Sequence, residues 1–300
     1  MYRHFLVPLD GTKLAEAVLP GTLELARRCQ ARVTLLHILE QRAPTTIHGD
    51  RHLRHVGEAE AYLAEVLGRL DFPRDRLAFE AHPQPEGDVA RSIFHHAGEL
   101  KADLLVLSTH GRFGWREWLF GTVAQKVLRR GAPPVLMLQP GLSGQAPEFK
   151  PERALVYVEG AAHSETALQA AEQLAQQCGL RLHLVMCIPT QATLAAEQAA
   201  AAALLPTTMA AILDLAERGA AEQLQGHLEE LQAQKLTASA QVVRGDALSQ
   251  LTEVARQRQA DILCLTTHGE SGLAALGTPE VAPKMLARFK GALLLAHAGE

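Results

Sequence analysis

Apolar runs alternate with segments of helical spacing along the whole chain. In the first half, the apolar runs predict strands near residues 4–9, 32–38, 76–81, 103–108 and 134–138. Between these runs, the spacing of apolar residues predicts helices near residues 13–29, 52–70, 88–100 and 122–130. The run Leu104–Leu107 has no polar position, which is typical of a strand buried on both faces. Pro20 lies inside the first predicted helix and should kink it or shift its start.

The second half repeats this alternation. Its apolar runs predict strands near residues 153–158, 181–187, 238–243, 261–266 and 292–296. The order strand, helix, strand predicts an α/β fold in which a parallel sheet is covered by helices. We therefore expect two tandem, doubly wound, parallel five-stranded sheets with flanking helices. In such a fold the ligand crevice lies beyond the carboxyl ends of the strands.

The two halves are copies of one sequence. EGDVARSIFHHAGELKADLLVLSTHG (86–111) matches RGDALSQLTEVARQRQADILCLTTHG (244–269) at a constant offset of 158 residues, as between Gly87 and Gly245. FLVPLDG (5–11) matches ALVYVEG (154–160) at an offset of 149 residues. The chain is therefore an internal repeat.

The change of offset means that the second copy carries nine extra residues. We place them in its Ala-rich segment near 195–206. Pro and Gly residues between the copies indicate a linker at 140–151. The predicted domains are 1–139 and 152–297.

Composition narrows the class of protein. The formal net charge is −4 and no long basic run occurs, so the electrostatic footprint of a nucleic-acid-binding protein is absent. No apolar stretch predicts a signal peptide or a membrane span. The four cysteines show no CxxC spacing, which favours free thiols in a reducing compartment. We expect a cytoplasmic protein that binds neither nucleic acid nor membrane.

Small and polar residues follow the fourth predicted strand. The segment 108–111 (Ser-Thr-His-Gly) is followed by nine residues and then by Gly121-Thr122 at the start of a helix. Glycine allows close backbone approach, and the first amides of a helix attract a phosphate. Ser108 could donate to such a phosphate. Asp10, at the end of the first strand, could accept from an adenine amino group or a ribose hydroxyl.

These segments resemble the universal stress protein family, in VPLDGT, LLHI, ADLLVLSTHG and GTVAQKVL. The ATP-binding pattern of that family is Gly, two residues, Gly, nine residues, Gly, then Ser or Thr. It fits here with Ser108 in place of the first Gly. The resemblance covers essentially the whole chain, once per half, and implies a Rossmann-like fold of the adenine-nucleotide alpha hydrolase type.

The resemblance implies that the first domain binds ATP, with Mg²⁺ or Mn²⁺ on the phosphates. Asp10 and Ile38 would hold adenine. Ser108 and Gly111 would hold the ribose and the first phosphates, and the helix start at Gly121 the later ones. The expected nucleotide-binding residues are Pro8, Leu9, Asp10, Gly11, Ile38, Ser108, His110, Gly111, Arg112, Gly121, Thr122 and Val123.

The second copy has a degenerate form of this motif. Glu159 replaces Asp10, and its longer side chain would intrude on an adenine edge. The phosphate loop is two residues shorter. Pro279 occupies the place of Val123 and removes a backbone N–H, while Glu280 adds a carboxylate where a phosphate would lie. We expect this site not to bind ATP.

The leading hypothesis is a non-catalytic, ATP-binding regulatory protein of the stress response. A slow ATPase or phosphotransferase on the same site and a nucleotide-free interaction scaffold are the alternatives. No catalytic residue is predicted, since no activated nucleophile or base is evident. His48, His52 and His55 could hold a metal ion, but a solvated helix face explains their spacing better, so no metal site is predicted. By resemblance, the fifth strands would pair the two domains as an intramolecular pseudo-dimer, and a homodimer is possible.

Overall fold

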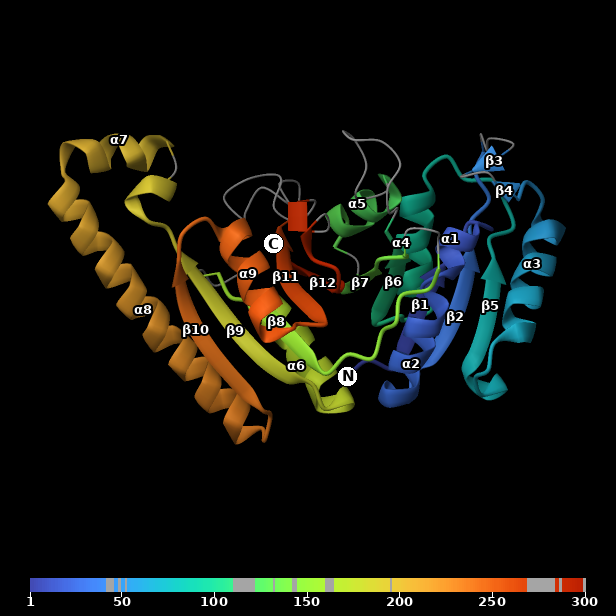
Figure 1. Ribbon diagram of the computed structural model, residues 1–300. Coiled ribbons are helices and arrows are strands. Elements are labelled where there is room, and N and C mark those ends of the chain that lie inside the picture. Colours follow the sequence, from blue (N-terminus) through green and yellow to red (C-terminus); the bar gives the residue numbers. More distant parts are fainter. Residues whose placement is uncertain are drawn as a thin grey trace. The chain divides into compact units, whose positions relative to one another are not determined.

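The computed structural model describes residues 1–41, 46–47, 50–51, 53–109, 122–131, 133–141, 145–159, 165–194, 196–268, 284–285 and 288–298. The chain divides into two compact units, Met1–Lys150 and Pro151–Glu300, called domain 1 and domain 2 below (Figure 1).

Domain 1 contains a parallel sheet of five strands in the order β7-β6-β1-β2-β5. The strands are β1 (His4–Pro8), β2 (Arg32–His37), β5 (Leu77–Ala81), β6 (Leu104–Ser108) and β7 (Val135–Leu138). The central strands are buried on both faces, as the continuous apolar runs predict. A short antiparallel hairpin, β3 (Thr46–Ile47) and β4 (Asp50–Arg51), follows β2 in the sequence.

The helices of domain 1 connect these strands. They are α1 (Lys13–Glu16), α2 (Leu19–Cys29), α3 (Val56–Arg69), α4 (Val89–Glu99) and α5 (Thr122–Arg129). Right-handed crossovers place α1 to α3 on one face of the sheet and α4 with α5, which pack together, on the other. The segment near 13–29, predicted as one helix that Pro20 would kink or whose start it would shift, forms two helices, and Pro20 lies in the first turn of α2.

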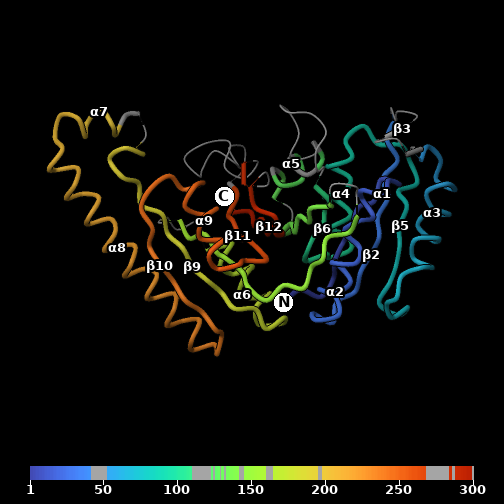
Figure 2. Tube along the Cα trace, in the orientation of Figure 1, coloured from blue at the N-terminus to red at the C-terminus, as the bar shows by residue number. Residues whose placement is uncertain are grey.

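Domain 2 has the same topology, with strand order β10-β9-β8-β11-β12. Its strands are β8 (Arg153–Tyr157), β9 (Arg181–Ile188), β10 (Ala238–Arg244), β11 (Ile262–His268) and β12 (Ala292–Ala298). Its helices include α6 (Glu165–Cys178), α7 (Ala196–Leu204), α8 (Pro206–Ala233) and α9 (Ala247–Arg258). The long helix α8 packs along β10 and β9 (Figure 2). The predicted fold class, two doubly wound five-stranded parallel sheets, is confirmed.

The strand register refines the position of the extra residues in domain 2. Val33 pairs with Leu77 in domain 1, and Leu182 pairs with Ala238 in domain 2. The offset between the copies is thus 149 residues on the second strand and 161 on the third, so the α7–α8 region contains twelve extra residues. Domain 1 has three more residues directly after β5, which restores the offset of 158 at Gly87.

Two contacts recur at matching positions in both domains. Asp103 accepts hydrogen bonds from the backbone N–H groups of Arg3 and His4, at 2.6 and 3.0 Å. Asp261 accepts from two backbone N–H groups at the start of β8, both at 2.9 Å. Each aspartate therefore ties its own strand to the first strand of its domain. Their repetition at the predicted offset assigns these residues to the fold rather than to a ligand.

Candidate functional site

Asp10 lies just beyond the carboxyl end of β1, in a turn that its own side chain stabilises. Its Oδ1 accepts hydrogen bonds from the Thr12 N–H at 2.9 Å and from the Thr12 hydroxyl at 2.7 Å. The Thr12 hydroxyl oxygen accepts in turn from the Ala15 N–H at 3.1 Å and caps α1. Gly11 has φ +89°, a conformation that an L side chain rarely adopts. The chain therefore turns sharply away from the sheet at this point.

The end of β1 is fastened to β2 through a buried histidine. The Leu9 N–H donates to the Leu36 carbonyl at 2.8 Å, and His37 Nδ1 lies 2.7 Å from the Leu9 carbonyl oxygen. His37 is almost fully buried. The His37 side chain thus bonds to the Leu9 carbonyl oxygen, which would otherwise accept the next backbone hydrogen bond from β2. Sequence reasoning missed this contact, because it joins residues 28 positions apart.

Ile38 therefore presents an open backbone edge. In a parallel ladder, groups two residues apart point the same way, so its N–H and C=O face the β1 side like those of Leu36. On the β1 side, however, the chain has already turned away from the sheet at Asp10. Within the described part of the chain, neither group of Ile38 has a hydrogen-bond partner, although its side chain is buried. Unpaired backbone groups at a buried position are costly, about 1–3 kcal/mol each, and call for a ligand or water.

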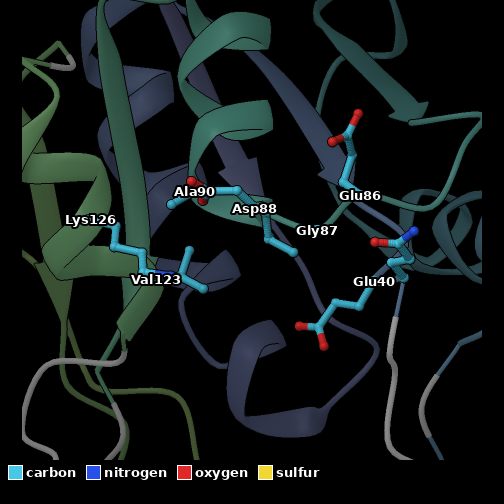
Figure 3. A pocket seen from close by; sticks show the side chains of 9 residues that line it. Glu40, Glu86, Gly87, Asp88, Ala90, Val123 and Lys126 are labelled. Carbon is cyan, nitrogen blue, oxygen red and sulfur yellow. The ribbon is translucent and has the colours of Figure 1, made fainter.

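A cavity of about 320 Å³, within the size range of ligand sites, lies beside the segment that follows Ile38; of the expected residues that the structure describes, Val123 alone is in its lining. Its lining includes Glu40, Glu86, Gly87, Asp88, Val123 and Lys126. Figure 3 shows Val123 and Lys126, from α5, on one side and Glu40 and Glu86 on the other. The cavity therefore connects Val123, an expected phosphate residue, with the segment that follows Ile38. Its carboxylates suit hydroxyl and amino donors better than phosphates.

Asp88, one of the lining residues, has a structural role. Asp88 caps α4 by accepting from the Arg91 N–H at 3.2 Å, and its Oδ2 pairs with Arg130 at 2.6 Å. In domain 2, Asp246 likewise caps α9 through the Ser249 N–H. That hydrogen bond, with a smaller contribution from Arg288, lowers the pKa of Asp246. Because the arrangement recurs in both domains, we assign Asp88 to the fold.

Two histidines stabilise the side of the cavity that contains Glu86. His82 Nε2 lies 3.0 Å from Glu86 Oε1, and His82 Nδ1 lies 2.9 Å from His96 Nε2 on α4. The Glu86 N–H donates to the Leu39 carbonyl at 2.8 Å. These contacts fix the segment after β5, where the three additional residues of domain 1 lie. Pro83 and Pro85 signal a break in the ladder there, but the pairing of the histidines is not readable from sequence.

Ser108 is at the end of β6, beside the crevice. Its hydroxyl donates to the Leu14 carbonyl at 2.9 Å. The hydroxyl proton of Ser108, which we expected to reach a phosphate, is therefore donated to a group of the protein itself. The lone pairs of the Ser108 oxygen can still accept a hydrogen bond from a ligand. Of the other expected residues, Pro8 ends β1 and Thr122 and Val123 begin α5. His110, Gly111, Arg112 and Gly121 lie outside the described residues.

In domain 2, different residues surround the edge that corresponds to Ile38. Cys187 takes the place of Ile38, and Val158 donates to Val185 as Leu9 does to Leu36. Burial raises the pKa of the Tyr157 phenol, and the nearby charge of Glu159 adds to this shift. A carboxylate and a phenol thus adjoin the edge. Met186 takes the place of His37 and cannot make its hydrogen bond. Pro279 and Glu280 lie outside the described residues.

The sequence model of the universal stress protein family matches residues 1–139 and 151–296, so this chain belongs to that family, with two copies in tandem. Universal stress protein YxiE of Bacillus subtilis is 27% identical over 150 residues, covering 46% of this chain and all of that protein. A universal stress protein from Archaeoglobus fulgidus has a similar fold, with a TM-score of 0.64 at 15% identity, covering 99% of this chain and 98% of that one. A putative universal stress protein from Pseudomonas aeruginosa gives a TM-score of 0.63 at 16% identity, covering 99% and 93%.

The described residues lack two features. None of their helices combines the length and the apolar character that crossing a membrane requires. No three of their His, Cys, Asp or Glu side chains are gathered as a metal site would need. His55 precedes α3, while His48 and His52 lie outside the described residues.

Proposed function

We propose that domain 1 binds ATP and that the bound nucleotide serves a regulatory rather than a catalytic purpose. The observation that carries this proposal is the backbone N–H and C=O of buried Ile38, which have no hydrogen-bond partner in the described part of the chain and lie at the strand ends where Asp10 also lies. Membership in the universal stress protein family supports a nucleotide but does not choose the base. The backbone edge supports that choice.

Adenine complements this edge. Its amino group donates a hydrogen bond and its neighbouring ring nitrogen accepts one, which matches a carbonyl and an N–H side by side. Guanine presents the opposite order, an acceptor oxygen and a ring N–H. Each mismatched pair would leave two buried groups unsatisfied, at a cost of about 1–3 kcal/mol per group. The edge should therefore favour ATP over GTP by at least about a hundredfold.

The remaining contacts follow from the crevice and the motif. The lone pairs of Ser108 suit a ribose hydroxyl, and the first amides of α5 at Thr122 and Val123 suit phosphates. We propose Mg²⁺ or Mn²⁺ on the phosphates themselves. No described side chain suggests an activated nucleophile, which favours binding without rapid turnover.

The cellular setting is also part of the proposal. All four cysteines are free thiols. That state is typical of proteins from a reducing compartment, so we propose action in the cytoplasm.

Two measurements on the purified full chain test the proposal. Mass spectrometry of nucleotide released on denaturation should detect ATP, and titration calorimetry should give tighter binding of ATP than of GTP. Equal affinities would contradict the adenine edge. Absence of binding for either nucleotide would favour the interaction scaffold instead.

A further inference from the structure

Two histidines of domain 1 form a bridge between carboxylates, called the histidine bridge below. His82 Nδ1 lies 2.9 Å from His96 Nε2, and the two rings are nearly perpendicular, at 82°. At one end of the bridge, His82 Nε2 lies 3.0 Å from Glu86 Oε1. At the other end, His96 Nδ1 lies 3.3 Å from Glu80 Oε1 and 3.6 Å from Glu99 Oε2. The bridge thus joins the segment after β5 to α4 through three contacts in a row.

Two neutral histidines carry too few protons for these three contacts. Each contact, between two nitrogens or between a nitrogen and a carboxylate oxygen, needs one proton. A neutral imidazole carries one N–H and an ionised carboxylate carries none, so the neutral pair supplies two protons. In every tautomer, at least one contact therefore lacks a proton and places lone pairs against each other. One additional proton on the pair satisfies all three contacts at once.

The missing proton is visible in the structure at His96 Nδ1. His96 is almost fully buried, and its Nδ1 makes no hydrogen bond within the described part of the chain. The two carboxylates beside this atom cannot donate to it, since an ionised carboxylate only accepts. A buried polar atom without a hydrogen bond calls for an explanation. A proton on Nδ1 supplies one, because the ring could then donate to Glu80 or Glu99.

Other charged side chains do not neutralise the carboxylates of the bridge. Within the described ranges, Glu80, Glu86 and Glu99 form ion pairs with histidines alone. Helix α3 lies on the opposite face of the sheet. The other described titratable side chains at this end of β2 and at α4 and α5 have contacts elsewhere or line the cavity: His37, Asp88, Arg91, His95, Lys126 and Arg130. An extra proton on the histidine pair would therefore supply the positive charge that these carboxylates lack.

Domain 2 has the same fold without the histidine bridge. The strand β10 corresponds to β5 at an offset of 161 residues, and α9 corresponds to α4 at an offset of 158. The residues at the matching positions are Gln241, Val243, Val254 and Gln257, in place of Glu80, His82, His96 and Glu99. The fold therefore does not require the bridge. The bridge occurs where domain 1 has its three additional residues, beside the cavity.

We propose that the histidine bridge is a proton-binding site, and that one proton taken up in mild acid holds the segment 82–86 firmly on α4. Histidine is the side chain that exchanges a proton near neutral pH. Only one proton fits, because a second would place two N–H groups against each other across the contact of 2.9 Å between His82 and His96. Glu86 lines the cavity (Figure 3), so the pH would set how firmly that side of the cavity is held. This inference does not depend on nucleotide binding.

Long-range ¹⁵N NMR of the histidine rings in the full chain, from about pH 8 to about pH 5, counts these protons. The signal that disappears in His82→Gln assigns that ring. His82 and His96 should change together and take up one proton between them, as a coupled pair does. Uptake of two protons over this range, or no change in protonation, overturns the proposal.

Hydrogen exchange of the backbone amides in segment 82–86 tests the effect on the cavity. After correction for the intrinsic pH dependence of exchange, protection should be about threefold to tenfold greater at about pH 5.5 than at about pH 7.5, because the proton adds a hydrogen bond. In the double variant Glu80→Gln, Glu99→Gln, an amide N–H can donate to His96 Nδ1 without acid. Both side chains reach the surface, so the fold should be kept. The variant should therefore be protected equally at both pH values.

Two controls accompany this measurement. Glu60→Gln removes an exposed carboxylate from α3 and should keep the pH dependence of the wild type. The matching segment of domain 2, residues 241–245, contains no histidine and should gain no protection in acid. Equal protection of segment 82–86 at both pH values in the wild type overturns the proposal, as does a pH dependence that the double variant retains in full. Circular dichroism confirms that each variant is folded.

Discussion

Asp10 and Thr12 form a closed turn in which one carboxylate oxygen accepts both the N–H and the hydroxyl of the threonine. The threonine then caps α1 through the Ala15 N–H. In the described part of the chain, the other carboxylate oxygen of Asp10 has no hydrogen-bond partner. The residue therefore has a structural task at Oδ1 and an oxygen available for a ligand at Oδ2.

Replacing Asp10 should affect binding and stability together. Asp10→Ala removes a charge-assisted hydrogen bond to the nucleotide, worth about 1.5–3 kcal/mol, so ATP affinity should fall about tenfold to a hundredfold. It also loosens the capped turn, at a cost of about 0.5–2 kcal/mol in unfolding free energy. Titration calorimetry and urea unfolding measure the two effects separately.

Two controls separate these effects. Thr12→Val removes the cap but keeps the carboxylate, so it should lower stability with a much smaller loss of affinity. Glu159→Ala, at the matching position in domain 2, should leave ATP affinity unchanged. Wild-type affinity in Asp10→Ala would show that this carboxylate does not contact the nucleotide.

Sequence patterns predicted the fold because its strands are continuous apolar runs and its repeat is regular. Strand and helix positions agree with the structure to within a few residues. Pro20 was expected to kink the first predicted helix or shift its start, and the structure has two helices there, with Pro20 in the first turn of α2. The twelve extra residues of the α7–α8 region appeared as nine, because a shorter segment after β10 partly compensates for them. Such compensation is invisible until the strand register is known.

The sequence also predicted that the strand ends carrying Asp10 and Ser108 are neighbours, but it did not predict the contacts made there. The end of β1 and the Gly-rich motif placed Asp10 and Ser108 at neighbouring strand ends. The open edge of Ile38 depends on where the ladder stops, which sequence locates only within one or two residues. His37 and Leu9 meet through tertiary structure alone. The use of the Ser108 hydroxyl by Leu14 likewise required the packed helix.

Domain 2 should lose stability in mild acid through His183. Burial, assisted by the charge of Arg258, lowers the pKa of this histidine to about 4. A histidine in the unfolded chain has a pKa of about 6.5. Between this pH and about 4, the unfolded state therefore binds a proton that the folded state does not bind. The free energy of unfolding should therefore fall as the pH drops from about 6.5 toward 4.

Urea unfolding at about pH 7 and pH 5 measures this loss, for which we expect about 1–2 kcal/mol from His183. His183→Leu removes the titrating group, so the difference between the two pH values should shrink by that amount. His4, whose pKa is also lowered by burial, should leave a residual slope. An unchanged difference in His183→Leu would exclude this origin.

Bound ATP should turn over far more slowly than the median enzyme rate of about 10 per second. The carboxylates of Glu40 and Glu86 lie on the side of the cavity opposite Val123, where the phosphates are expected, so they are poorly placed to activate water there. ADP release, followed under saturating ATP with Mg²⁺, measures the rate. Sustained turnover near the median would mean that the protein is an enzyme, and the Asp10→Ala variant would then show whether this site performs the reaction.

The central claim is that only domain 1 binds ATP, although Cys187 of domain 2 stands at the position of Ile38. We attribute the difference to Glu159 and to Pro279 and Glu280 in the second phosphate loop. Gly121→Val should abolish binding, because a β-branched side chain blocks backbone approach to the phosphates. Gly277→Val, its counterpart in domain 2, should leave binding unchanged.

Trp115 and Trp118, the chain's two tryptophans, lie in the first phosphate loop. Their fluorescence should therefore follow ATP in a single saturable phase that Gly121→Val removes.

The stoichiometry of ATP on the nucleotide-free full chain, measured by titration calorimetry, tests this claim most directly. One ATP per chain is the predicted result. Two ATP per chain, or equal losses from Gly121→Val and Gly277→Val, would contradict it.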